Sequence, residues 1–255
     1  MIPTVEHFAR PPDARAVNTA SLLLAGEVFD DIIDLRLISA FVGPSGTGKT
    51  FALRTLMAER AARCEFVCLD VQERATMRSI AQALYRSLTG EDAPARITRH
   101  ELSYEVIELL TDVQGKPLVI ALDEAQRLNT ECIEYLRYLH DDSSTHFAVV
   151  LAGGDGCWEV IAAEPMLRSR VWEPTFFKPL SERALLELLP FFHAIYADVD
   201  HDLLLRINDR RCESNLRQWA GFTARALSLM DRLGEPKLTP ELVQVALRDP
   251  SATTS

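Results

Sequence analysis

One stretch of eight residues constrains the fold of this 255-residue chain more than any other feature. It fits the pattern GxxxxGK[ST] and consists of Gly43, Pro44, Ser45, Gly46, Thr47, Gly48, Lys49 and Thr50. An apolar run over residues 35–42 precedes it, and a helical pattern over residues 50–63 follows it. Between a strand and a helix, this pattern forms a loop that cradles phosphate groups. The sequence therefore predicts a strand, a phosphate-binding loop and a helix in direct succession.

The residue types in this loop fit a nucleoside triphosphate bound together with Mg²⁺. Glycines let backbone N–H groups converge on phosphate oxygens with no Cβ in the way, and the following helix adds the positive end of its dipole. Lys49 would reach the β- and γ-phosphates, and the Thr50 hydroxyl would ligate Mg²⁺. We therefore expect all eight residues of the loop to contribute to binding ATP and Mg²⁺.

A pair of carboxylates follows a second apolar strand. The run over residues 118–122 ends directly at Asp123 and Glu124, on the edge of the sheet where open α/β proteins bind their ligands. Asp123 would hold Mg²⁺, and Glu124 would act as the general base for the attacking water. The alternative is a strand that ends in a solvated acidic turn. The pair lies 80 residues after Gly43, downstream of a well-formed phosphate loop, which favours the catalytic interpretation.

Strand and helix patterns alternate through the first two thirds of the chain. The strand patterns cover residues 35–42, 66–69, 118–122, 147–151 and 171–177. This alternation predicts an α/β fold in which a parallel sheet is covered by helices on both faces. After residue 178 only helical patterns remain. We expect an extended arm over 1–20, a nucleotide-binding core over 21–178, a small all-helical lid over 179–249 and a polar tail over 250–255.

The segments GPSGTGKT and LVIALDEAQRL resemble the two nucleotide motifs of AAA+ ATPases. The stretch DEAQRL over 123–128 resembles the branch that includes origin-recognition-type ATPases and the bacterial transposon target-selection ATPases of the Mu-type and TniB-like group. The resemblance covers roughly residues 20–250. It implies a five-stranded αβα core, a helical lid and ATP-driven homo-oligomers in which the nucleotide lies between neighbouring subunits.

The same resemblance implies two catalytic arginines. Arg170, with Arg168 as the second candidate, matches the arginine that reaches into the neighbouring subunit's site, and a surface ion pair is the alternative. Arg217 matches a lid arginine that contacts the γ-phosphate, although Ser214 stands where the family has glycine. The family also places a polar sensor residue at the end of the fourth strand. Here the nearest polar residue is Asp155, whose carboxylate a γ-phosphate would repel, so we expect hydrolysis to be slow.

The net charge of −10 argues against a general polyanion binder but leaves room for a local basic site. Residues 54–100 hold eight arginines against six acidic residues, whereas residues 101–142 hold three cations against ten. In transposition relatives, the DNA-contacting loops follow the second strand and precede the third. The corresponding residues here are Arg74, Arg78, Arg96, Arg99 and His100. They would contact phosphates without reading sequence, and solvated helix faces are the alternative.

These observations predict a slow ATPase that assists DNA transposition, with double-stranded DNA and an integrase-type transposase as partners. A nucleotide-gated signalling or scaffold switch with little hydrolysis is the main alternative, and a replication initiator or helicase loader is the third. The five cysteines lack paired spacing and are expected to be buried and reduced. With no signal-peptide pattern and no apolar run of about 18 residues, we expect a cytoplasmic protein without membrane contact.

Overall fold

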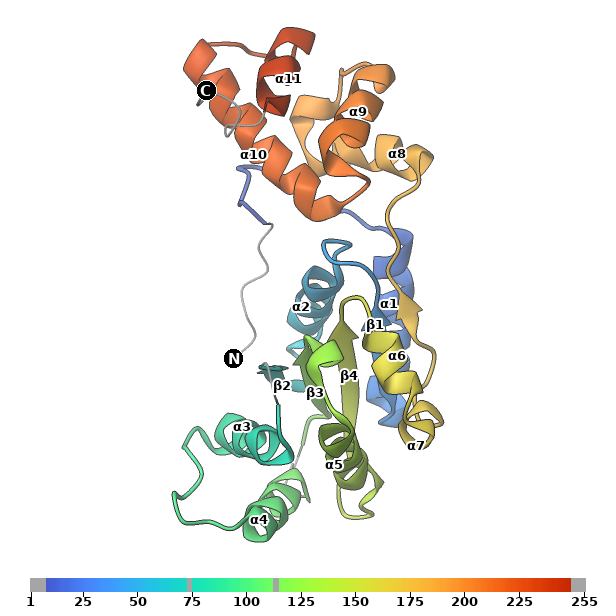
Figure 1. Cartoon of the computed structure of the whole chain (residues 1–255), viewed down its shortest axis with the longest axis vertical. Coiled ribbons are helices and arrows are strands. Elements are labelled where there is room, and N and C mark those ends of the chain that lie inside the picture. Colours follow the sequence, from blue (N-terminus) through green and yellow to red (C-terminus); the bar gives the residue numbers. More distant parts are fainter. Residues whose placement is uncertain (1–7, 73–74, 112–114, 249–255) are drawn as a thin grey trace. The chain divides into compact units, whose positions relative to one another are not determined.

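The computed structural model describes residues 8–72, 75–111 and 115–248. They divide into two compact units (Figure 1). The first unit comprises Ser21–Ser45 and Lys49–Phe177. The second comprises the described residues before Ser21, the three residues Gly46–Gly48, and the chain from Lys178 onward.

Within the described residues, five strands form a single sheet in the order β2-β3-β4-β1-β5, and every neighbouring pair runs parallel. The strands are β1 (Ile38–Val42), β2 (Glu65–Asp70), β3 (Leu118–Asp123), β4 (Phe147–Gly153) and β5 (Thr175–Phe176). All residues of β1 and β4 are buried, as expected for uncharged apolar strands covered on both faces. The predicted α/β fold with a five-stranded parallel sheet is confirmed.

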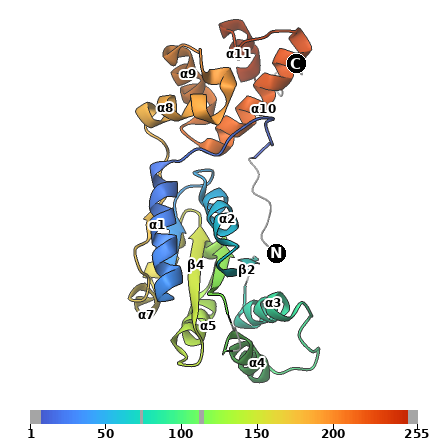
Figure 2. The same ribbon diagram turned by 180° about the vertical axis from the view of Figure 1, so that it is seen from behind.

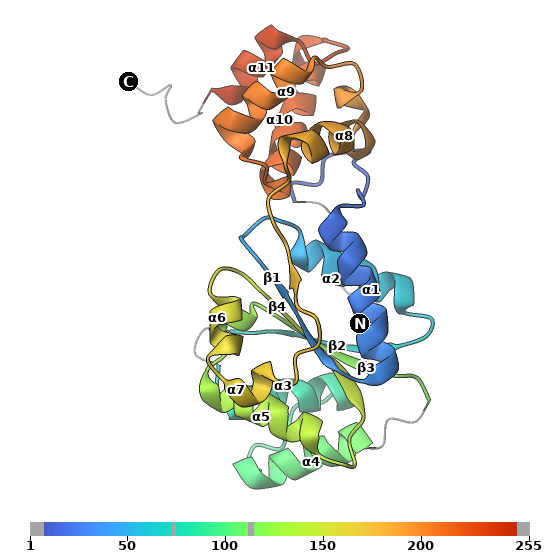
Figure 3. The same ribbon diagram turned by 90° about the vertical axis from the view of Figure 1, so that its right-hand side faces the viewer.

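Helices cover both faces of this sheet because successive strand residues point to opposite sides. Val119 and Ala121 of β3 pack with α1 (Ala20–Leu35) and α2 (Lys49–Arg60). Ile120 and Leu122 pack on the other side. The helices of that side are α3 (Met77–Thr89), α4 (Arg99–Thr111), α5 (Thr130–Asp141), α6 (Cys157–Ala162) and α7 (Pro165–Arg168) (Figures 2 and 3).

The second unit is built from helices around its own apolar core. Its main helices are α8 (Glu182–Phe192), α9 (His201–Ile207), α10 (Leu216–Leu233) and α11 (Pro240–Leu247), with the short turns η2 (Ala194–Tyr196) and η3 (Asn208–Cys212). Tyr196, Trp219 and Phe222 are almost completely buried at its centre. Ser181 caps α8, and Thr239 caps α11 with Pro240 at its first position.

Three local features differ from the sequence-based expectations. The predicted strand over 171–177 is reduced to β5 and a single bridge between Val171 and Ile38, because Pro174 between them has no N–H to donate. The short helices α6 and α7 carry too few residues for a helical period to be visible in the sequence. The expectation of buried cysteines is wrong for Cys68, which is exposed because β2 forms the edge of the sheet.

No helix in the described ranges combines the length and the apolar character needed to cross a membrane.

Candidate nucleotide site

The predicted phosphate loop and the carboxylate pair lie at the same edge of the sheet. β4 lies between β3 and β1, and its residues are in register with both neighbours: Gly153 with Val42 of β1, and Leu151 with Leu122 of β3. The loop that begins at Gly43 and the turn that begins at Asp123 therefore flank the end of β4. Parallel α/β sheets bind ligands at this carboxyl edge, where the strand order reverses.

Backbone geometry explains the glycines of the loop. Gly43, Gly46 and Gly48 have φ values of +148°, +81° and +100°, which side-chain-bearing residues rarely adopt. A Cβ at Gly43 would also overlap the carbonyl oxygen of Phe177. The shape of the loop therefore favours glycine at these positions, and successive backbone N–H groups in such a loop can form an anion-binding concavity.

Lys49 is the first residue of α2 and is only 8% exposed. Its Nζ donates hydrogen bonds to the carbonyl oxygens of Gly43 and Pro44, both at 2.7 Å. The ammonium group is thereby directed into the loop and largely removed from water, where its attraction for phosphate oxygens is strongest. Thr50 follows in the first turn of α2 and is half-buried.

The donor types at this edge fit Mg²⁺. Thr50 offers a hydroxyl and Asp123 a carboxylate, the hard oxygen ligands that this ion prefers. Among the described residues, no group of three or more His, Cys, Asp and Glu side chains forms a metal site. A small protein ligand set suits Mg²⁺, which usually takes one or two protein ligands and completes its shell with phosphates and water.

Glu124 adopts a left-handed backbone conformation (φ +59°) at the start of the 3-10 turn η1 (Ala125–Arg127). Its N–H donates to Asp123 Oδ1 at 3.0 Å. Its carboxylate Oε2 accepts a hydrogen bond from Gln126 Nε2 at 2.7 Å and lies 3.4 Å from Arg127 Nη2. No role for Gln126 or Arg127 is predicted from the sequence, although both belong to the DEAQRL stretch that resembles the AAA+ motif.

Lys49 and Asp123, two charged residues of the site, both affect the pKa of the buried Cys157 thiol. Burial raises its pKa to about 12, while the nearby Lys49 ammonium acts to lower it and the carboxylates of Glu159 and Asp123 act to raise it. The thiol is therefore neutral at physiological pH. Lys49 and Asp123 both lie near the start of α6, which follows the end of β4.

Arg170 forms an ion pair with Asp141 of the same chain. Its Nε and Nη2 donate to the two carboxylate oxygens of Asp141 at 2.6 and 2.7 Å, and Nη1 donates to the Met166 carbonyl oxygen. Partial burial acts to raise the pKa of Asp141, but the bonds from Arg170 and Arg137 outweigh it and lower this pKa overall. Arg168, in contrast, is exposed, and within the described residues no hydrogen bond or ion pair engages its side chain.

Arg217 lies in the first turn of α10, where Asn215 caps the helix by accepting from the N–H groups of Arg217 and Gln218. Its side chain is exposed, and its guanidinium lies 5.8 Å from the centre of the Phe8 ring. Within the second unit, the Arg217 N–H also donates to the Gly46 carbonyl oxygen at 3.3 Å. The preceding Ser214 has a φ of +56°, which explains why a glycine would suit this position.

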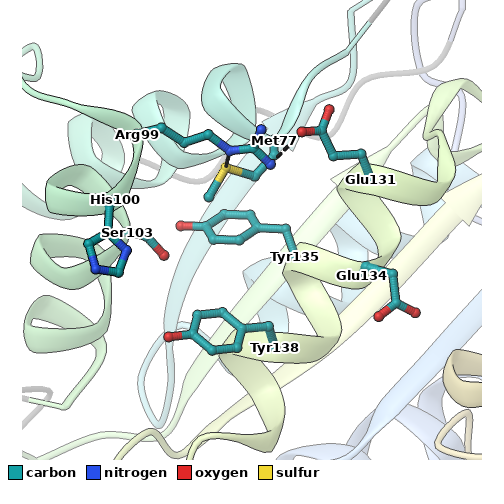
Figure 4. Close-up of a pocket in the computed structure, with 8 residues that line it drawn as sticks. All are labelled: Met77, Arg99, His100, Ser103, Glu131, Glu134, Tyr135 and Tyr138. Atoms are coloured by element: carbon teal, nitrogen blue, oxygen red, sulfur yellow. Dashed lines mark hydrogen bonds and ion pairs between the residues drawn. The ribbon is translucent and has the colours of Figure 1, made fainter.

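The predicted DNA-contacting arginines are partly engaged in contacts within the chain. Arg78 Nη2 donates to the Ile97 carbonyl oxygen at 3.0 Å. Arg99 forms an ion pair with Glu131 and a 2.8 Å contact with Met77 Sδ (Figure 4). Arg96 is exposed, and among the described residues its side chain forms no hydrogen bond or ion pair. Arg74 lies outside the described residues.

Arg99 and His100 line a pocket of about 550 Å³ rather than an open basic face. Figure 4 shows Tyr135 and Tyr138 of α5 pointing toward His100 and Ser103 of α4. Glu131 and Glu134 also line this pocket, so its charge is mixed. This part of the surface is less favourable for DNA phosphates than the arginine count alone indicates.

The glycine-framed loop and the acidic pair at the carboxyl edge of a parallel sheet define a P-loop nucleotide-binding protein. The family model described as the AAA domain matches residues 33–161, which is half of the sequence, and the chain belongs to this family. No curated protein gives a significant match.

Several solved structures share the fold. The ORC2 protein of Aeropyrum pernix, in ADPNP–ADP complexes, superimposes with a TM-score of 0.69 at 17% identity, over 92% of this chain and 68% of that one. CDC6P of Pyrobaculum aerophilum gives a TM-score of 0.70 at 18% identity, with the same coverage. The RuvB Holliday junction branch migration motor of Thermotoga maritima gives 0.60 at 16%, over 91% and 69%. At these identities the likeness establishes the fold.

Proposed function

We propose that the chain is a slow ATPase that binds ATP with Mg²⁺ in the glycine loop. The observation that carries the proposal is the buried Lys49 ammonium inside this loop, at the sheet edge that also presents Asp123 and Glu124. Lys49 and the loop N–H groups would bind the phosphates, and Thr50 and Asp123 would hold Mg²⁺. Bound Mg²⁺ would neutralise the charge that develops on the phosphates. Glu124 would accept the proton of the attacking water.

Replacing Glu124 by glutamine tests the proposal, since the amide keeps the shape of the side chain and cannot accept a proton. Turnover of Glu124→Gln should fall by about 10²-fold or more, the usual contribution of a positioned base. ATP binding should persist, measured as the thermal shift caused by Mg-ATP. The exposed Glu105 on α4 offers a matched control, and Glu105→Gln should retain full turnover. Equal turnover of Glu124→Gln and the parent would contradict the assignment.

We also propose that the chain assembles into homo-oligomers through its nucleotide sites. Arg168 suits the arginine that acts on the neighbouring subunit better than Arg170 does, because Arg170 is held by Asp141. Met166 and Trp172, close to Arg168 in sequence, are 51% and 43% exposed, and their apolar surface favours burial in a subunit contact. Arg217 remains our candidate for the lid arginine, with residues 179–249 acting as the lid.

The cellular role we propose is DNA-associated, as an ATP-dependent accessory factor that selects targets for an integrase-type transposase. Support comes from the sequence resemblance of DEAQRL and from the fold shared with the Aeropyrum pernix ORC1 protein, whose structure was solved in complex with DNA. That protein gives a TM-score of 0.66 at 18% identity, over 93% of this chain and 66% of that one. A nucleotide-gated switch and a replication-initiator role are the alternatives.

Fluorescence anisotropy of a labelled duplex, with ATP, a slowly hydrolysed analogue or ADP, distinguishes these roles. Binding should require ATP and should weaken steeply with salt, because phosphate contacts release counterions. Arg96→Ala should weaken binding and flatten the salt dependence without changing ATP affinity. Arg183→Ala on α8, where the arginine is paired with Glu187, is the matched control. Absence of binding by ATP-loaded oligomers at low salt would favour the nucleotide-gated switch.

A further inference from the structure

The side chain of Gln126 connects the proposed general base to the end of a neighbouring strand. Its Nε2 donates to Glu124 Oε2 at 2.7 Å, and its Oε1 accepts from the Gly154 N–H at 2.8 Å. Both ends of one amide are thus used, one on the carboxylate and one on the backbone that follows β4. Because Gly154 continues a fully buried strand, it is a rigid anchor for the Glu124 carboxylate.

The glycines at the end of β4 leave room for this amide. A Cβ on Gly153 would lie 2.7 Å from Gln126 Oε1 and would clash with the Cys157 Sγ, so a side chain at this position is excluded. A Cβ on Gly154 would lie 3.7 Å from Gln126 Nε2, in ordinary contact. The strand end therefore has no polar side chain of its own, and the polar group beside it is supplied from η1 by Gln126.

Without Gln126, little would hold Glu124 in one orientation. Glu124 has a left-handed backbone at the start of a three-residue turn, and its side chain forms no capping hydrogen bond. Among the described residues, the other side chain that contacts its carboxylate is Arg127, which lies 3.4 Å away, is 38% exposed and also donates to the Val71 carbonyl oxygen. An ion pair with that exposure contributes little to orientation, because water competes for both partners.

From these contacts we infer that Gln126 is a positioning residue for ATP hydrolysis, which acts by fixing the Glu124 carboxylate against the end of β4. The inference rests on the proposed ATPase function. With Oε2 held by the Gln126 amide, the second carboxylate oxygen, Oε1, is the one available to accept a proton from water. The amide can hold the carboxylate only as a donor, and it can bind Gly154 only as an acceptor. A substitution can therefore remove the donor to Glu124 and keep the acceptor for Gly154, so the two contacts can be tested separately.

Steady-state ATP hydrolysis by Gln126→Ala and Gln126→Glu tests this inference. Gln126→Ala should lower kcat by about 10- to 30-fold, the factor that corresponds to the side-chain entropy of an unrestrained glutamate. Gln126→Glu keeps an acceptor for the Gly154 N–H but has no donor for Glu124, so it should lose at least as much. ATP affinity and thermal stability should stay close to those of the parent. Gln82, exposed on α3, provides the controls Gln82→Ala and Gln82→Glu, both with full turnover.

The outcomes separate this inference from the ATPase proposal. If Glu124→Gln lowers kcat strongly while Gln126→Ala stays within twofold of the parent, the base assignment stands and the positioning role of Gln126 is refuted. The inference is also overturned if Gln126→Glu keeps the kcat of the parent while Gln126→Ala has a lower kcat. In that case the contribution of Gln126 is to accept a hydrogen bond from the Gly154 N–H, and its bond to Glu124 is not needed. A parent chain that binds ATP and never hydrolyses it refutes the ATPase proposal itself.

Discussion

Removing the Lys49 ammonium should separate nucleotide binding from folding. In the structure Nζ donates two hydrogen bonds to carbonyl oxygens, at 2.7 Å each. Bonds from a charged donor contribute about 1.5–3 kcal/mol apiece. The cost of dehydrating a buried ammonium and about 1.5–2 kcal/mol of lysine rotamer entropy oppose this gain. We therefore expect the folding stability of Lys49→Ala to differ from that of the parent by no more than about 2 kcal/mol.

The effect of this substitution on ATP binding should be larger. Loss of two charge-assisted bonds to phosphate, about 3 kcal/mol at the lower limit, weakens binding by about 10²-fold. At an ATP concentration of about 100 times the parent's Kd, bound ligand stabilises the parent by about 2.7 kcal/mol. For a chain of this size, that corresponds to an increase in Tm of about 5–11 °C. The same ATP concentration would raise the Tm of Lys49→Ala by only about 1 °C.

Thermal unfolding with and without Mg-ATP measures both effects. Lys237→Ala is the control, since this lysine is 76% exposed, and its ATP-induced shift should equal that of the parent. Circular dichroism of Lys49→Ala in the absence of nucleotide should show the parent's helix and strand content. An equal ATP-induced shift in Lys49→Ala and the parent would refute the assignment of residues 43–50 as the phosphate loop.

Three further predictions concern other parts of the chain. Mixing Arg168→Ala with Lys49→Ala should restore turnover if the arginine acts across a subunit interface; no recovery in mixtures shown to co-assemble would contradict this. A hydrogen bond from Arg60 is the main cause that lowers the pKa of Asp30 below its ordinary value of 3.8, while partial burial opposes it. The resulting stability is present at neutral pH and disappears as the pH falls through the lowered pKa. The Tm of Asp30→Asn should therefore be below the parent's by at most about 4 °C at pH 7, with no difference in strong acid. Finally, iodoacetamide followed by mass spectrometry should modify Cys68 in the native protein, while the four buried cysteines react only after unfolding.

The sequence predicts the sheet well because its strands are short, apolar and followed by glycine or acidic turns. The run over 118–122 contains no charged residue, and the structure has β3 over Leu118–Asp123. The strand at 171–177 was less predictable. It contains Glu173 and Pro174, and only two of its residues pair as β5, at the edge of the sheet. Apolar periodicity reports burial, so it is least informative where a strand is half exposed.

The sequence motifs of the candidate site could be predicted, but the side-chain contacts between distant residues could not. The pattern GxxxxGK[ST] depends on backbone torsions, and glycine is the residue type that permits the positive φ values seen in this loop. The ion pair of Arg170 with Asp141 joins residues 29 positions apart, and no local pattern indicates it. The bond from Gln126 to Gly154 spans 28 positions and depends on the order of β3 and β4 in the sheet.

The three candidate roles are a transposition factor, a replication initiator and a nucleotide-gated switch. They differ in whether oligomerisation must increase the affinity for DNA. A single chain carries a net charge of −10, and Arg78 and Arg99 are already held by contacts within the chain. Its affinity for a duplex should therefore be weak. In an oligomer the exposed Arg96 would recur in every subunit, and many weak phosphate contacts would act together. A transposition factor or an initiator needs this summation, so its DNA affinity must follow the ATP-dependent oligomer, whereas a signalling switch can oligomerise without gaining any affinity for DNA.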